Sequence, residues 1–324
     1  MQESETREQS LASPSENGTG GPVMPVPAQP PGSPSHVGPA QAGPPPGPVP
    51  PAPVPGPAPC PTCGSNGAAM PASYVYALGR IEPRFRRLSV EKEFAQATGR
   101  AETVNLTDRQ ALRQVLEQNR YLVKQLCWVM TVGGLETYII VPRDPTDWSL
   151  LVETLRPNPQ PGDVDLSVGM RGPLAPPEMC NGLLVPIVAF DQLYSFDRDS
   201  LIGSIPRPER VAAERFREAA AEVFDRIMQL TDNAGATDEH RALNYLTVRY
   251  PAIYAAVAQA HGRNLSLTAV DVGPSALSGV RNIVEVIFSF TDRATDVVEK
   301  QFLKVDVTEE FPFLVTRLSP YYDR

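Results

Sequence analysis

The chain has 324 residues and a net charge of −8, with 20% charged and 42% hydrophobic residues. This length suggests about two domains, and the composition fits a soluble globular protein. Nucleic-acid binding is not expected, because it would need a basic face. No apolar run approaches the roughly 20 residues that span a bilayer, and the acidic N-terminus lacks the apolar segment of a secretory signal. We therefore expect a cytoplasmic protein with no membrane partner, whose four cysteines are reduced thiols.

Residues 1–72 differ in composition from the rest of the chain. Pro14 through Pro71 hold 20 of the 36 prolines, and Gly, Ala, Ser and Val fill the gaps. Such a segment buries too little apolar surface to offset the entropy of ordering it, so we predict a disordered tail. Its proline runs favour polyproline II and predict a semi-rigid tether, with a ligand for a proline-binding module as the alternative.

The motif Cys60-Pro-Thr-Cys63-Gly64 ends the tail and is the sharpest local signal. Two cysteines at this spacing can bind one tetrahedral zinc ion, and the glycine permits the turn. A structural zinc site needs two further ligands. Cys180 lies in a predicted loop and is the better candidate for one of them, whereas Cys127 lies in a buried-strand pattern and is expected in the core. Two chains that pool their motifs, a redox pair and unligated thiols are the alternatives.

Residues 73–205 form the first predicted folded subdomain. Gly133-Gly134 separates two apolar strand patterns, which is a strong signal for a β-hairpin. Residues 183–190 are nearly all apolar and predict a strand inside a sheet, where Pro186 should mark a bulge or an edge. Apolar residues at helical spacing after Thr107 predict a helix with that residue as its cap. The further predicted elements are strands at 74–81 and 163–170 and helices near 89–94 and 147–155.

Residues 206–324 form the second predicted subdomain, which is organised around a β-meander. Apolar residues alternate along 283–290 and 297–307, and this period of two is typical of half-buried strands. The polar residues 291–296 supply the hairpin connection between them, and a third strand is predicted at 313–318.

Two long amphipathic helices precede this meander. They are predicted at about 208–231 and 237–262, and Pro251 is expected to kink the second helix. We expect the two helices to cover the apolar face of the meander. Hairpin order rather than βαβ order in both subdomains predicts an α+β protein with mostly antiparallel sheet.

Candidate chemistry is limited to carboxylates. They gather from Asp191 to Asp199, in a predicted loop after the most buried strand, where a catalytic or metal-binding role competes with helix capping by Asp197 or Asp199. Asp163 and Asp165 share one face of a predicted strand and can act as a pair. No nucleophile motif accompanies any of the three histidines, so no protease triad is detectable. The sequence therefore does not decide whether the chain is an enzyme.

Several long motifs run through the folded part of the chain. They read ASYVYALGRIEPRF at 72–85, SVEKEFAQ at 89–96, GMRGPLAPPEMCNG at 169–182, DQLYSFD at 191–197, DNAGATDEHRALNY at 232–245 and LSPYYDR at 318–324. Together they resemble the C-terminal domain of cyanobactin maturation proteins of the PatA/PatG type. The resemblance covers roughly residue 72 to the end and leaves the Pro-rich tail outside it.

The resemblance implies a context rather than a mechanism. In that family the domain follows a subtilisin-like protease or macrocyclase, has no assigned activity, and belongs to pathways that make ribosomal, modified, cyclic peptides. It supplies no catalytic residues to carry over, and no protease half is recognisable in this sequence.

Three functional hypotheses follow from the residues and the resemblance together. The first is a non-catalytic accessory domain that binds a precursor peptide or a pathway protease or cyclase. The second is an uncharacterised metal-dependent enzyme that uses the segment from Asp191 to Asp199 with Cys180. The third is a purely structural homodimerisation domain. The only cofactor considered is zinc, with Cys60, Cys63 and Cys180 as the candidate ligands.

Overall fold

The computed structural model describes residues 73–100, 108–209, 211–229 and 232–322. The predicted disordered tail with Cys60 and Cys63, and the predicted helix cap Thr107, lie outside these residues. The described residues from Ser73 onward belong to one compact unit. They mix helices with mostly antiparallel sheet, as the sequence predicts.

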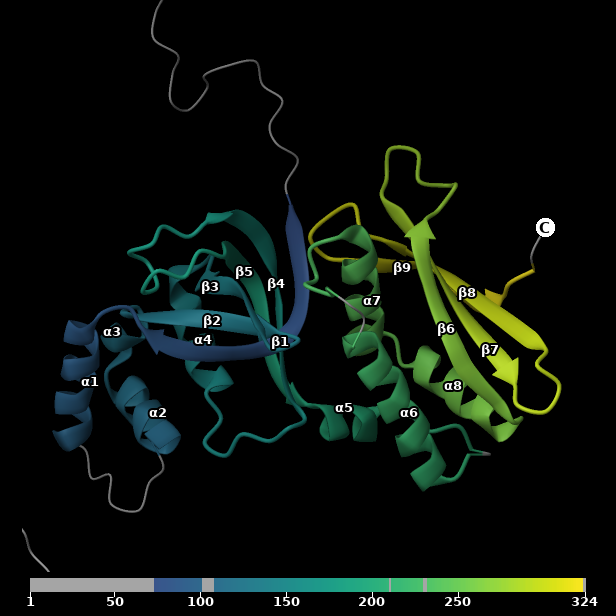
Figure 1. Cartoon of the computed structure of the whole chain (residues 1–324), viewed down its shortest axis with the longest axis horizontal. Helices are drawn as coiled ribbons and strands as arrows, with labels where there is room; N and C mark the ends of the chain where they lie inside the picture. Colours follow the sequence, from purple (N-terminus) through teal and green to yellow (C-terminus); the bar gives the residue numbers. More distant parts are fainter. Residues whose placement is uncertain (1–72, 101–107, 210, 230–231, 323–324) are drawn as a thin grey trace, which may run out of the picture. The chain divides into compact units, whose positions relative to one another are not determined.

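Five strands close into a barrel in the order β1-β2-β3-β5-β4 (Figure 1). Neighbouring strands are antiparallel except β3 and β5, which run parallel to each other. Closure removes the free strand edges that an open sheet would expose. The strands are β1 (Tyr74–Phe85), β2 (Leu126–Val132), β3 (Leu135–Pro142), β4 (Asp163–Leu174) and β5 (Pro186–Asp197).

The predicted hairpin at Gly133-Gly134 is confirmed. Both glycines have positive φ, +57° and +85°, and they connect β2 directly to β3. Two consecutive residues with positive φ suit the right-handed twist of the flanking strands, and only glycine adopts them without steric cost. Pro186 is the first residue of β5, a position where its missing amide donor disrupts no interior ladder.

The helices between Leu88 and Thr154 pack on the barrel. One core combines alternate residues of β1, β2, β3 and β5 with residues of these helices, and Trp128, Met130 and Phe190 are among its fully buried side chains. In Figure 1, α1 and α2 lie at the end of the barrel away from α6 and α7. The elements are α1 (Leu88–Arg100), α2 (Asp108–Gln118), α3 (Arg120–Val123), the 3₁₀ turn η1 (Pro145–Asp147) and α4 (Trp148–Thr154).

From Arg198 onward, which we call the second half, the described residues form four helices and a four-stranded antiparallel sheet. Its strand order is β6-β7-β8-β9, so the predicted meander is confirmed as β7, β8 and β9, and β6 pairs with its first strand. The apolar faces of the sheet and the helices share one core. The elements are α5 (Arg198–Ser204), α6 (Ala213–Met228), α7 (Asp238–Arg249), α8 (Ala252–Gly262), β6 (Leu265–Pro274), β7 (Ile283–Asp292), β8 (Val298–Asp306) and β9 (Phe313–Pro320).

The second predicted long helix is two helices. Tyr250 leaves helical geometry with φ −123° and ψ 83°, and Pro251 starts α8 instead of kinking one continuous helix. The residue before a proline is disfavoured in the helical region, so the chain breaks there rather than bends. The first predicted long helix is confirmed as α6, with Phe216, Val223 and Ile227 on its buried face.

The barrel and the second half meet along β1. Tyr76 and Leu78 point away from the barrel core and join the core of the helices and the second sheet. Tyr76 is bonded at both backbone groups, because its N–H donates to the Gly235 carbonyl at 2.9 Å and its carbonyl accepts from Asn244 at 2.8 Å. A Cβ on Gly235 would lie 2.3 Å from the Tyr76 carbonyl oxygen, so the close approach requires glycine.

The structure differs from the expectation that all cysteines are reduced. Cys127 of β2 and Cys180 of the β4–β5 connection form a disulfide. Both side chains are buried with Val129, Ile139 and neighbouring apolar residues in a small separate core. Cys127 is thus a core residue, as predicted, and its bond ties the β4–β5 connection to the barrel wall.

No helix in the part of the chain that the structure describes is long and apolar enough to cross a membrane.

Candidate functional site

The carboxylates of Asp163 and Asp165 lie side by side on β4, as the sequence predicts. Their residues are only 6% and 1% exposed. Burying two like charges is costly unless each one is paired and hydrogen-bonded. The surroundings of the pair therefore decide whether it is a reactive site or a structural one.

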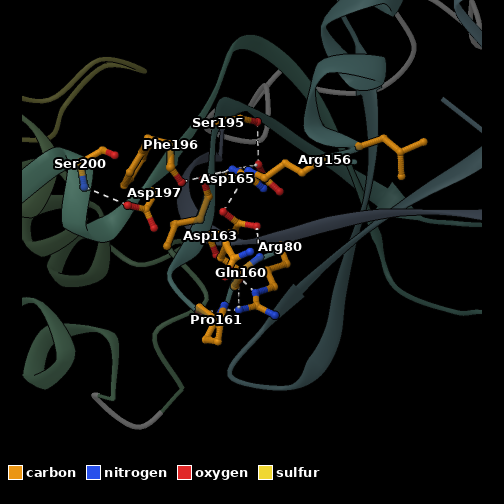
Figure 2. Close-up of polar contacts among 12 residues, drawn as sticks. Arg80, Arg156, Gln160, Pro161, Asp163, Asp165, Ser195, Phe196, Asp197 and Ser200 are labelled. Carbon is orange, nitrogen blue, oxygen red and sulfur yellow. Dashed lines mark hydrogen bonds and ion pairs between the residues drawn. The ribbon is translucent and has the colours of Figure 1, made fainter. Parts of the chain in front are cut away.

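Arg156 contacts both carboxylates (Figure 2). Its Nε lies 3.3 Å from Asp163 Oδ1, and its Nη2 lies 3.1 Å from Asp165 Oδ1. The same Nη2 donates to the backbone carbonyls of Val164 at 2.9 Å and Phe196 at 3.2 Å. A single planar guanidinium thus bridges the pair and ties β4 to β5.

Asp165 has further hydrogen-bond donors around it. The backbone N–H of Ile81 donates to Oδ2 at 2.8 Å, and the Ser195 hydroxyl donates to Oδ1 at 2.6 Å. Burial raises the pKa of the Asp165 carboxyl, while the contacts from Ser195 and Arg156 oppose that rise. Each oxygen of this carboxylate therefore has a partner, and the group links β1, β4 and β5.

The turn before β4 is fixed in the same way. Asp163 Oδ2 accepts from the backbone N–H of Gln160 at 2.6 Å. Arg80 of β1 donates to the backbone carbonyls of Gln160, Pro161 and Asp163 (Figure 2). These contacts tie the turn at 160–163 to the barrel wall.

The space that both carboxylates share is too small for a substrate. The cavity that Asp163 and Asp165 both line has a volume of about 20 Å³, enough for one water molecule. A larger open pocket of about 440 Å³ lies outside it, between the β2–β3 hairpin and α6, and only Asp163 of the pair lines it. A general acid or base must come within hydrogen-bond distance of its substrate, and no substrate fits in the cavity beside Asp165. The contacts of Asp165 therefore support the fold.

The segment from Asp191 to Asp199 is not a loop. Asp191 and Asp197 both lie on β5, and Asp199 lies in the first turn of α5. A strand rises about 3.3 Å per residue, which puts Asp191 and Asp197 roughly 20 Å apart along β5, too far to share a metal ion. Asp197 Oδ2 accepts from the Ser200 N–H at 2.9 Å and caps α5 (Figure 2), in agreement with the capping alternative.

Asp191 belongs to a second polar cluster, which the sequence does not reveal. Arg143, just after β3, donates from Nη1 to Asp191 Oδ2 at 2.7 Å and lies 3.4 Å from Glu310 Oε2 of the β8–β9 loop. Burial raises the pKa of Glu310 to about 7, and Asp191 adds to that rise while Arg143 opposes it. Burial alone would raise the pKa of Asp191, but its contacts with Glu310 and Arg143 lower it.

The three predicted metal ligands are not brought together among the described residues. The Cys180 sulfur is bonded to Cys127, so it is no thiolate in this state, and Cys60 and Cys63 lie outside the described part. Within the described residues, no group of three or more His, Cys, Asp or Glu side chains is placed to hold a metal ion. The zinc prediction for Cys60 and Cys63 stays a prediction.

The outer strand of the second sheet and the loop before it present apolar side chains to solvent. Phe311, Phe313 and Val315 are 46%, 50% and 39% exposed. Phe313 and Val315 lie on β9, which pairs with β8 on one side and ends the sheet (Figure 1). An edge strand with exposed apolar residues is a surface on which another extended chain can add.

Comparison with known proteins finds two matches. Residues 210–321 match the family model described as PatG C-terminal. A solved structure described as "PatG Domain of Unknown Function" has the same fold, with a TM-score of 0.64 and 19% sequence identity. The match covers 77% of this chain and 98% of that chain, so the common fold extends well beyond the family segment. No curated protein matches.

Proposed function

We propose that this chain is a non-catalytic accessory domain of a ribosomal modified-peptide maturation pathway of the cyanobactin kind, and that it binds an extended segment of a precursor peptide along β9. The PatG C-terminal match and the resemblance of the motifs support the pathway context. The observation that carries the binding role is the exposed apolar edge formed by Phe311, Phe313 and Val315.

The chemistry of this edge suits a peptide in strand conformation. An added strand gains affinity from main-chain hydrogen bonds and specificity from alternate side chains. Phe313 and Val315 are two positions apart, so they present their side chains at the spacing of such an added strand. The Arg281 guanidinium lies 5.3 Å from the centre of the Phe313 ring and orders this anchor before binding.

The Pro-rich tail fits the same role as a tether. A tethered domain meets its partner at a raised effective concentration without any new contact. A second copy of the chain is the competing partner for β9, since two copies can pair their edge strands about a two-fold axis.

The test is affinity capture with the full chain in cells that make the modified peptide. Val315→Glu adds a charge to the proposed edge, and Val297→Glu is its control, because Val297 is 60% exposed but lies in the turn between β7 and β8. Mass spectrometry should find a precursor peptide with the wild type and the control, and a strong loss with Val315→Glu.

Three results would count against this proposal. Equal capture by all three forms would move the contact away from β9. Light scattering that finds a dimer lost in Val315→Glu, with no peptide captured, would assign the edge to a second copy. Stoichiometric zinc with no captured peptide would favour a metal-dependent role over peptide binding.

A further inference from the structure

The β8–β9 loop is held by a buried arginine of α7. Arg241 donates from Nη1 to the Val307 carbonyl at 2.7 Å and from Nη2 to the carbonyls of Glu309 and Glu310. Its guanidinium also lies 5.3 Å from the centre of the Tyr74 ring on β1. These contacts fix the backbone of the loop, so the side chain of Glu310 is presented to the barrel in a defined place.

The carboxylates of Glu310 and Asp191 both contact one nitrogen of the Arg143 guanidinium. Arg143 Nη1 contacts both Asp191, at 2.7 Å, and Glu310, at 3.4 Å. The Glu310 side chain is only 12% exposed, so solvent screens it poorly. One cation therefore faces two acids, and full ionisation leaves an uncompensated negative charge at the contact between loop and barrel.

One buried oxygen of Glu310 is left without a partner in the part of the chain that the structure describes. Glu310 Oε1 is buried and has no hydrogen-bond partner among the described residues when the group is a carboxylate. A proton on Glu310 turns the group into a donor that hydrogen-bonds to Asp191. Two carboxyl groups that share a site commonly retain one proton between them.

We propose that Asp191 and Glu310 share one proton in the folded protein, and that this proton latches the β8–β9 loop onto the barrel. The charged or titratable groups around the pair are Arg143 from the barrel, Arg241 and Asp238 from α7, and Tyr74 from β1. With the proton present, Arg143 balances the single negative charge of Asp191. Without it, the two carboxylates repel each other and the loop loosens.

The direction of the pH dependence follows from the raised pKa of Glu310. Its contribution to stability is complete below the ordinary value of 4.5 and is lost as the pH rises through about 7. The loop leads directly into β9, so the latch also sets how firmly Phe311 and Phe313 are presented. The latch itself does not depend on what binds to β9.

The direct test is a ¹³C titration of glutamate side-chain carboxyls in the full chain, followed by NMR. Glu310 should titrate with a midpoint near 7, and Asp191→Asn should move that midpoint toward 4.5, because the neighbouring charge is gone. Glu309→Gln is the matched control, since Glu309 is exposed and adjacent, and it should leave the midpoint unchanged.

Hydrogen exchange of the amides at 307–311 gives a second readout. After correction for the intrinsic rate, wild-type protection should fall by roughly tenfold between pH 6 and pH 8. Glu310→Gln keeps a permanent donor toward Asp191, so its protection should stay nearly constant over that range. A wild-type midpoint near 4.5, or an unchanged midpoint in Asp191→Asn, would overturn the latch. The titration decides the matter even if Glu310→Gln fails to fold.

Discussion

Arg156 is the residue on which the polar interior of the barrel depends. It is the counter-charge for both Asp163 and Asp165, and no other basic side chain among the described residues forms an ion pair with either. Replacing it with methionine keeps much of the side-chain volume and leaves two buried carboxylates unpaired. We expect Arg156→Met to lower the free energy of unfolding by about 3–5 kcal/mol, measured by urea denaturation.

A surface ion pair provides the comparison. Arg263 and Glu299 are 2.9 Å apart, and each is about half exposed, so solvent screens their attraction. Arg263→Met should cost no more than about 1 kcal/mol. Similar losses for the two variants would mean that the buried pair does not depend on Arg156.

At the residue scale, the sequence predicts only part of these polar clusters. Asp163 and Asp165 were found because strand alternation puts them on one face, but their partners Arg156 and Ser195 lie in other elements. Glu310 lies 119 positions from Asp191 in the numbering of the chain, and no local pattern connects them. Only the folded chain distinguishes a pair that is held by structural contacts from a reactive one.

At the scale of elements, local patterns predicted much of the second half. The alternation along β7 and β8, the turn between them and the helix stripe of α6 each come from contiguous residues. The barrel was not predicted, because its closure needs β3 and β5 to pair in parallel across the intervening β4. A pairing between distant segments leaves no periodic mark in the sequence.

The disulfide that holds the β4–β5 connection should contribute to the stability of the fold. Cys127 and Cys180 are 53 residues apart, and closing a loop of that size restricts the unfolded chain. The double variant Cys127→Ala/Cys180→Ala should lose about 2–4 kcal/mol of stability in denaturant.

Alkylation of denatured protein checks the bond itself. Without a reductant, peptide mapping should find Cys127 and Cys180 unlabelled, and with a reductant both should be labelled. Labelling of both residues before reduction would show that the protein carries free thiols at these positions.

At the scale of the whole molecule, the barrel and the second sheet should unfold together. Tyr76 and Leu78 of the barrel are part of the core beneath the second sheet, and Asn244 bonds to the barrel backbone. Both tryptophans, Trp128 and Trp148, lie in the first half, so their fluorescence reports on the barrel. Tryptophan fluorescence and far-ultraviolet circular dichroism should therefore give coincident urea transitions. Two separated transitions would show that the halves are energetically independent.

Site-specific cross-linking in cells tests whether β9 receives a pathway peptide. A photoreactive benzoylphenylalanine replaces Phe313 in the full chain, and the same group at Leu135 of the barrel hairpin, which is 72% exposed, is the control. After irradiation in cells that make the modified peptide, we predict a cross-link between position 313 and a precursor peptide, with none at position 135. Cross-links to that peptide at both positions, or at neither, would contradict the account.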